Sequence, residues 1–131
     1  MLPFVKTLYK AIDEYQKRNY KLSAQVFEEY FETKINGAVP ELDKEDTMMK
    51  LNLGNAQLFS NSPNDAINTY LDILDQSPNW DVPYMMLAVA YYKANKTELS
   101  KQCWEKSKQL GNPHTQTEYN EGIKKYTQYD K

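Results

Sequence analysis

The chain has 131 residues, of which 40% are hydrophobic and 26% are charged, and its net charge is −2 at pH 7. This composition is typical of a folded globular protein and disfavours intrinsic disorder, while the small negative charge disfavours a nucleic-acid partner. No apolar run approaches the roughly 20 residues that a membrane-spanning helix needs, and the N-terminus lacks the pattern of a signal peptide. We therefore expect a cytoplasmic protein without membrane insertion.

Apolar residues recur at helical spacing from one end of the chain to the other, and no segment shows the alternation of a strand. Polar capping residues, prolines and glycines separate the apolar stretches into seven expected helices. In chain order these cover residues 2–19, 19–35, 43–58, 62–74, 81–94, 97–110 and about 115–129. The expected fold is therefore all-α, with short turns between the helices.

Three of these boundaries carry clear local signals. Ser62 and Pro63 suit an N-cap and the first helical position after it. Gly111 follows the sixth apolar stretch, at the place where a left-handed residue ends a helix. The sequence "TQTE", residues 115–118, matches a capping box and is expected to open the final helix.

The order of the helices contains an internal repeat. When residues 47–80 are placed on residues 81–114, a shift of 34, both turns fall at the same offset. The identical pairs are Leu53/Leu87, Ala56/Ala90 and Asn61/Asn95, and the pairs of similar type are Gly54/Ala88, Ala66/Ser100 and Tyr70/Trp104. A period of 34 residues is that of a helix–turn–helix solenoid unit, so the repeat predicts stacked helical hairpins.

On these residues the chain resembles the tetratricopeptide repeat family. Its unit has a leucine and a small residue in the first helix, an alanine and an aromatic residue in the second, and a proline near the end. The matching residues are Leu53-Gly54, Ala66, Tyr70 and Pro78 in residues 47–80, and Leu87-Ala88, Tyr91, Ser100, Trp104 and Ser107 in residues 81–114. A first unit, residues 4–37, has Ala11, Tyr15, Tyr20, Ser23, Phe27 and Tyr30 at comparable spacing, without the leading leucine or the proline.

The resemblance implies a right-handed superhelical solenoid of three helical hairpins plus a capping helix, all in a single domain. The repeat units would be residues 4–37, 47–80 and 81–114, with residues 38–46 as an insertion and residues 115–129 as the cap. Stacked hairpins share an apolar face that a lone hairpin leaves open. The resemblance also explains Gly54, which costs a helix interior about 1 kcal/mol, as a small residue that allows close helix packing.

In such solenoids the first helix of each hairpin lines a concave groove that usually holds the ligand. By helical phase we expect a partner to bind the following residues, which we call the predicted face: Leu8, Ile12, Tyr15, Met48, Leu51, Asn52, Asn55, Phe59, Met85, Val89, Tyr92 and Lys93. This surface is apolar with little charge, and suits an apolar segment of another protein. Asn52 and Asn55 would hydrogen-bond the partner's backbone. In the alternative interpretation, the insertion or the N-terminus covers these residues and they are core.

One branch of the family grips acidic carboxyl-terminal tails of heat-shock proteins with a clamp of lysines, asparagines and an arginine. The corresponding positions here are Leu8, Ile12, Asn52, Val82 and Met86, and only Asn52 agrees. Because the cations are missing, a carboxylate clamp is disfavoured. The apolar lining is more similar to the branch of secretion chaperones, small acidic three-repeat proteins that hold an extended apolar segment of a cargo.

Neither a catalytic site nor a metal site is expected. His114 is the only histidine, and no cysteine or carboxylate is spaced to join it in a ligand set. Cys103, the only cysteine, lies on an apolar stripe beside Trp104, which favours a buried residue over a reactive thiol. Residues 41–46, "ELDKED", lack the spacing of a calcium loop. We also expect no cofactor.

The expected function is that of a non-enzymatic adaptor or chaperone-like module that binds an apolar peptide or helix of a partner protein on the predicted face. The alternative is a structural assembly subunit that forms a homo-oligomer through this face or through an end of the solenoid. A small secretion-type chaperone is a further form of the first hypothesis. An enzyme or a nucleic-acid binder is a third class, for which no residue can be nominated.

Overall fold

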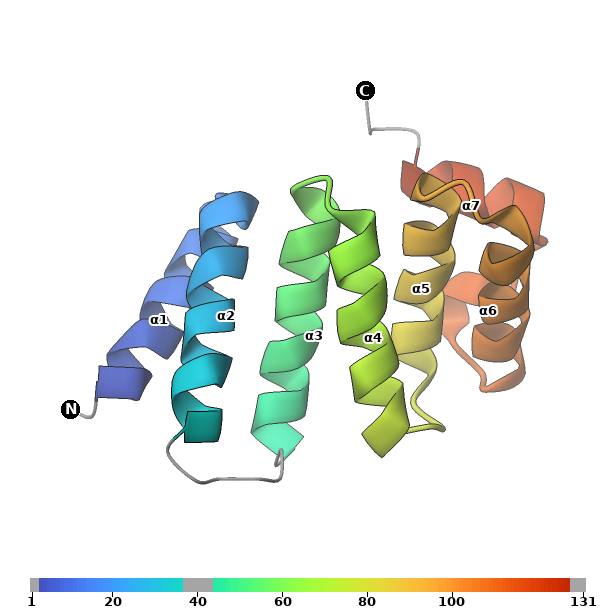
Figure 1. The fold of residues 1–131 in the computed structure, drawn as a ribbon. Helices are drawn as coiled ribbons and strands as arrows, with labels where there is room; N and C mark the ends of the chain where they lie inside the picture. The colour runs from blue at the N-terminus through green and yellow to red at the C-terminus, as the bar shows by residue number, and fades with distance from the viewer. Residues whose placement is uncertain (1–2, 37–43, 128–131) are drawn as a thin grey trace. The chain divides into compact units, whose positions relative to one another are not determined.

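The structure, a computed structural model, describes residues 3–36 and 44–127 (Figure 1). These residues form seven α-helices and one short 3-10 helix, and no strand occurs among them, which confirms the expected all-α class for this part of the chain. In chain order the elements are α1 (Pro3–Gln16), α2 (Tyr20–Asn36), α3 (Lys44–Phe59), α4 (Pro63–Gln76), α5 (Asp81–Lys93), α6 (Thr97–Gln109), the 3-10 helix η1 (Pro113–Thr115) and α7 (Tyr119–Thr127). None of the described helices has the length and apolar character of a membrane span.

The chain divides into two compact units, Met1–Ser62 and Pro63–Lys131. The first unit holds α1 to α3, and the second holds α4 to α7. The division falls at the turn between α3 and α4, inside the expected repeat 47–80. Of the expected insertion, residues 38–43 lie outside the described part of the chain, and residues 44–46 form the start of α3.

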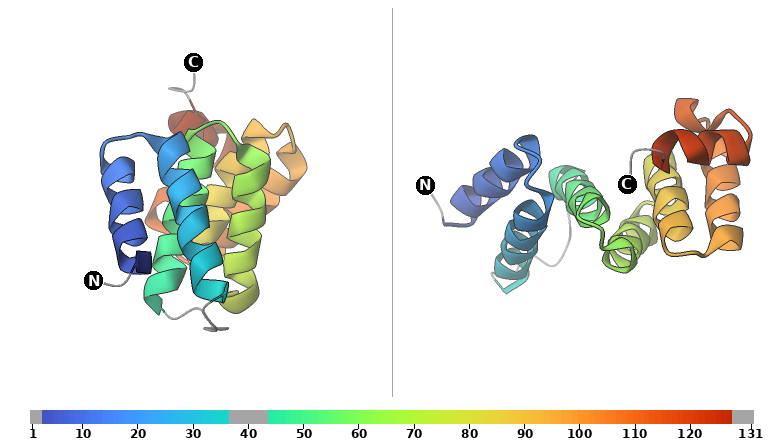
Figure 2. Two further views of the ribbon diagram at one scale, coloured as in Figure 1. Left: turned by 60° about the vertical axis from the view of Figure 1, so that its left-hand side comes forward. Right: turned by 90° about the horizontal axis from the view of Figure 1, so that it is seen from above.

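In the first unit, α1 and α2 form a hairpin and α3 packs against α2 (Figure 2). Their shared core is made of small, branched and aromatic side chains: Ala11, Ala24, Val26, Phe27, Tyr30, Phe31, Leu53 and Ala56. The hydroxyl of Ser23 donates a 2.9 Å hydrogen bond to the carbonyl of Ala11, which joins the two helices of the hairpin. The phenol of Tyr30 donates a 2.9 Å bond to Oδ1 of the buried Asp46, which ties α3 to α2.

In the second unit, α4 packs against α5, α5 and α6 form a hairpin, and α7 contacts both helices of that hairpin (Figure 2). The hydroxyl of Ser100 donates to the carbonyl of Ala88 and accepts a 2.8 Å bond from the phenol of Tyr119. The indole of Trp104 is fully buried. A Cβ at Gly122 would lie 2.1 Å from Trp104 Cζ2, so α7 approaches the indole too closely for any side chain there. α7 therefore covers the α5–α6 hairpin.

The final helix begins later than the sequence predicts. η1 occupies residues 113–115, and α7 begins at Tyr119 rather than near residue 115. The side chain of Asn112 accepts a 2.8 Å bond from the backbone N–H of His114 and so caps η1. The buried hydroxyl of Thr115 donates to the carbonyl of Asn112. Thr115 is therefore the last residue of η1, and the capping-box sequence does not start a helix at residue 115.

Four helices end in the same kind of turn. Arg18, Asn61, Asn95 and Gly111 each have a positive φ, between 62° and 86°. Each donates its N–H to the carbonyl three residues back, and the next residue donates to the carbonyl five residues back, which is the Schellman pattern. Asn95 follows Asn61 by 34 residues, and Asn61 follows Arg18 by 43, which is 34 plus the nine residues 38–46. The turns therefore recur with the period found in the sequence, and Gly111 ends α6 as predicted.

A second feature recurs inside the hairpins. The bond from a serine hydroxyl to the carbonyl of an alanine twelve residues earlier occurs in both the α1–α2 and the α5–α6 hairpin. In the expected middle repeat, residues 47–80, the equivalent positions hold Gly54 and Ala66, and both residues are buried. Small residues therefore stand at these positions three times along the chain.

Candidate functional site

α1 supplies the first part of the predicted face. Leu8, Ile12 and Tyr15 lie along one side of α1, because helical residues three or four apart share a side. All three are half-buried and pack against the core of the first unit. They therefore present only part of each side chain to solvent.

α3 supplies a second part of the predicted face in the same unit. Met48 and Phe59 are its exposed members, with 45% and 48% of their surface accessible. Asn52 and Asn55 lie between them along the helix and are half-buried, whereas Leu51 is buried. The accessible apolar surface of α3 is therefore near its two ends.

Three aromatic rings meet near the turn between α1 and α2. The ring centroids of Tyr15 and Tyr20 are 5.4 Å apart in an edge-on arrangement, and those of Tyr20 and Phe59 are 5.1 Å apart. Burial raises the pKa of the Tyr15 phenol, and a side-chain hydrogen bond with Asn55 partly offsets that rise. The structure thus brings Tyr15, Asn55 and Phe59 together around Tyr20, a residue that the sequence placed only in the repeat pattern.

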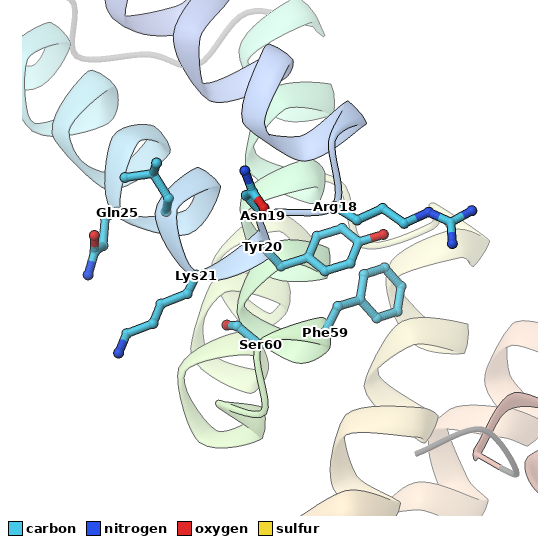
Figure 3. Close-up of a pocket in the computed structure, with 8 residues that line it drawn as sticks. Arg18, Asn19, Tyr20, Lys21, Gln25, Phe59 and Ser60 are labelled. Atoms are coloured by element: carbon cyan, nitrogen blue, oxygen red, sulfur yellow. The ribbon is translucent and has the colours of Figure 1, made fainter. Parts of the chain in front are cut away.

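Beside these rings lies a surface hollow with a volume of about 560 Å³, which we call the hollow (Figure 3). Its walls come from the turn between α1 and α2, the start of α2 and the end of α3. The lining residues carry cationic, amide, hydroxyl and apolar groups: Arg18, Asn19, Tyr20, Lys21, Leu22, Gln25, Phe59 and Ser60. Only Phe59 belongs to the predicted face. Of the others, Tyr20 belonged only to the repeat pattern. The remaining residues were not predicted, because most are polar and lie at or near the turns that follow α1 and α3.

The charged groups around the hollow differ in whether they have partners. Arg18 and Lys21 are exposed, and neither forms an ion pair with any residue that the structure describes. The nearby carboxylates of α1 are engaged in the contacts Asp13–Lys17, at 2.9 Å, and Glu14–Asn19, at 2.8 Å. The hollow therefore presents two positive charges to solvent.

α5 carries the part of the predicted face that lies in the second unit. Tyr92 is 40% exposed, Met85 and Lys93 are half-buried, and Val89 is buried. Tyr92 is therefore the side chain through which α5 presents most apolar surface.

A polar cluster joins the start of α5 to the end of α6. The amide of Asn112 donates a 2.8 Å bond to Asp81 Oδ2, and the hydroxyl of Ser107 donates a 3.0 Å bond to the Asp81 carbonyl. The hydroxyl of Thr115 lies 3.4 Å from that of Ser107. Across the described residues, no buried side-chain nitrogen or oxygen lacks a hydrogen-bond partner. The cluster is therefore satisfied internally and stabilises the turn into η1.

The side chains most suited to covalent or metal chemistry are Cys103 and His114. Burial raises the pKa of the Cys103 thiol to about 11, so the nucleophilic thiolate is disfavoured at neutral pH. His114 is exposed, and its ring meets that of Tyr126 edge-on, with centroids 6.2 Å apart. Within residues 3–36 and 44–127, no group of three or more His, Cys, Asp or Glu side chains could hold a metal ion.

Comparison with known proteins adds no assignment. No protein-family model matches the chain, and no curated protein matches it. The functional assignment therefore depends on the residues of the predicted face and of the hollow.

Proposed function

We propose that this chain is a non-enzymatic protein-interaction module of the tetratricopeptide repeat type, which binds an apolar peptide or helix of a partner protein on the predicted face. The recurring Schellman turns support the proposal, because their spacing includes the 34-residue period of the sequence repeat. The serine-to-alanine bonds of the α1–α2 and α5–α6 hairpins support it as well. In this proposal the hairpins stack into a right-handed superhelix whose first helices face the partner.

The observation that carries the proposal is the exposure of apolar side chains on the predicted face. Among the residues that the structure describes, seven large hydrophobic side chains are exposed, and Met48, Phe59 and Tyr92 are three of them. Aromatic side chains are enriched among the residues that dominate protein–protein binding, and methionine adapts to apolar partners of varied shape. An apolar segment of a partner would remove these side chains from water.

A structural subunit that self-associates is the second candidate function. Leu71 and Leu99 are 44% and 42% exposed, and neither belongs to the predicted face. Because they lie on α4 and α6, a second copy of the chain could bury them while the predicted face stays free. The sequence-based alternative places the contact on the predicted face or at an end of the solenoid. The exposed leucines add a further surface, and a dimer formed there would depend on them rather than on Met48 and Tyr92.

The test compares side chains of similar exposure on and off the predicted face. Met48→Glu and Tyr92→Glu each place a charge on the face, and Leu99→Glu places the same charge on α6 as a matched control. Each tagged variant is used to capture proteins from an extract of the native host, and mass spectrometry identifies them. We expect both face variants to lower capture of the partner by roughly tenfold, the effect of about 1.4 kcal/mol, and Leu99→Glu to leave capture unchanged.

Circular dichroism and thermal melting separate lost binding from lost folding. Because all three substituted side chains are exposed, we expect helicity to be retained in each variant. A partner that both face variants still capture would contradict the proposed function. Light scattering across a range of concentrations tests the second candidate: a stable dimer that Leu99→Glu dissociates would favour self-association.

A further inference from the structure

Arg18 is unusual among the residues that end the helices. The equivalent turns hold Asn61, Asn95 and Gly111, and asparagine and glycine are the residues that accept a positive φ most readily. Arg18 has a φ of 63°, which is unfavourable for an ordinary L-residue. Residues in sparsely populated backbone conformations cluster at functional sites.

The Arg18 side chain lies where it could meet a ligand. It lines the hollow together with Tyr20 and Phe59, and Lys21, in the first turn of α2, adds a second cation. Figure 3 shows both cationic side chains extended away from the ribbon. Neither is engaged by a carboxylate of the described residues, so both are available to a partner.

The equivalent turns of the chain do not carry this charge. The position of Lys21 corresponds to Asn64 after the turn at Asn61, and to Glu98 after the turn at Asn95. All of these turns close with the same backbone hydrogen bonds. The turn therefore needs neither cation, and the pair of positive charges is specific to the first hairpin.

We propose that the hollow binds an acidic segment of a partner protein in which carboxylates flank an aromatic side chain. The inference rests on the proposed function, because it assigns the chemistry of one stretch of the same partner. The guanidinium of Arg18 and the ammonium of Lys21 pair with the carboxylates. The aromatic side chain packs against the accessible parts of Tyr20 and Phe59, which is 48% exposed.

This arrangement differs from the carboxylate clamp that the sequence disfavours. None of the five clamp positions lines the hollow. A single-stranded nucleic acid also combines anionic groups with rings, but its binding depends on the neutralisation of several successive phosphates, and the hollow offers two cations. The peptide is therefore the favoured occupant, and an oligonucleotide is a competitor in the test.

The test uses the full chain and a fluorescent peptide in which two glutamates precede and two follow a phenylalanine. Binding is measured by fluorescence anisotropy, and the same peptide with glutamines in place of glutamates is the control. Arg18→Asn removes the charge and supplies the residue found in two equivalent turns, Lys21→Gln removes the second charge, and Lys96→Gln removes an exposed charge after α5. We expect Arg18→Asn to weaken binding about fivefold, the double variant more than about tenfold, and Lys96→Gln less than about twofold.

Melting temperatures distinguish a binding role of Arg18 from a structural one. Arg18→Asn should leave the melting temperature unchanged or raise it, so a loss of affinity in this variant cannot come from unfolding. Equal affinity for the glutamate and glutamine peptides would overturn the inference, and so would tighter binding of a thymidine oligonucleotide than of the peptide. Higher salt should weaken binding of the glutamate peptide, because the pairs are exposed.

The two proposals can fail separately. If the Arg18→Asn, Lys21→Gln double variant captures the host partner as well as the unmodified chain does, the inference about the hollow is wrong while the proposed function stands. If Met48→Glu and Tyr92→Glu leave partner capture intact while the double variant abolishes it, the hollow binds and the predicted face does not.

Discussion

The α1–α2 and α5–α6 hairpins share the same internal contact and differ at their turns. In each, a serine bonds to an alanine carbonyl, and a fully buried aromatic residue follows four positions later, Phe27 in one and Trp104 in the other. Their turns close with the same backbone bonds, yet one contains Arg18 and the other Asn95. The buried positions are thus filled alike, whereas the exposed turn position is free to vary. Specificity for a partner is therefore best sought where the hairpins differ.

The largest expected effect comes from the buried aromatic residues that the hairpins share. Phe27→Ala and Trp104→Ala should each lower the free energy of unfolding by about 3–5 kcal/mol, because each leaves a cavity in a packed core. Trp104→Ala should lie at the upper end, since its indole also donates a 3.0 Å bond to the Thr117 carbonyl and contacts α7. Urea denaturation measures both. A loss below about 1 kcal/mol at either site, the size typical of a single hydrogen bond, would show that the hairpins do not share this packing.

A smaller effect is expected from the serine of each hairpin. Ser23→Ala should cost about 1 kcal/mol, the usual net value of one hydrogen bond. Ser100→Ala should cost about 2 kcal/mol, because it also leaves the buried phenol of Tyr119 without its acceptor. Adding Tyr119→Phe to Ser100→Ala should recover part of that loss in a double-mutant cycle. Equal costs for the two serines would show that Tyr119 does not depend on Ser100.

Exchanging the turn residues should have the smallest effect on the free energy of unfolding. The effect should have opposite signs in the two hairpins. Arg18→Asn should stabilise the chain, and Asn95→Arg should destabilise it, each by up to about 1 kcal/mol, because asparagine accepts a positive φ more readily than arginine does. Differential scanning calorimetry of the two variants measures the shifts in melting temperature. Shifts of the same sign would mean that the two turns do not impose the same backbone conformation.

Features carried by local chemistry could be predicted from the sequence. Ser62 and Pro63 marked the start of α4, and Gly111 marked the end of α6, because capping depends on a few neighbouring residues. The helices themselves followed from apolar residues at helical spacing. The spacing of Asn61 and Asn95 also predicted a recurring turn, which the structure confirms.

Two kinds of feature could not be predicted: those in which one local signal overrides another, and those that bring together residues distant in the sequence. Nothing in the sequence around Arg18 indicates a positive φ, since glycine and asparagine, rather than arginine, are typical at such positions. The hollow brings the α1–α2 turn to Phe59 and Ser60, about forty residues away. The start of α7 was predicted too early because the "TQTE" sequence satisfies a local rule that η1 overrides. Helical phase also placed Leu51 and Val89 on the predicted face without showing that they are buried. Their burial depends on how other parts of the chain pack against them.

The contacts of α7 limit where a further helical hairpin could be inserted into this chain. Tyr119 and Gly122 contact Ser100 and Trp104 of the hairpin through one hydrogen bond, one edge-on ring contact and one close approach. The ammonium of Lys101 also lies 5.9 Å from the centre of the Tyr119 ring. A hairpin duplicated between α6 and α7 would separate these residues unless the copy brought the same serine and tryptophan with it. A duplication before residue 81 leaves them in contact. Evolution or engineering can therefore lengthen this chain more readily from its N-terminal side, with the segment from α5 to α7 transferred as one piece.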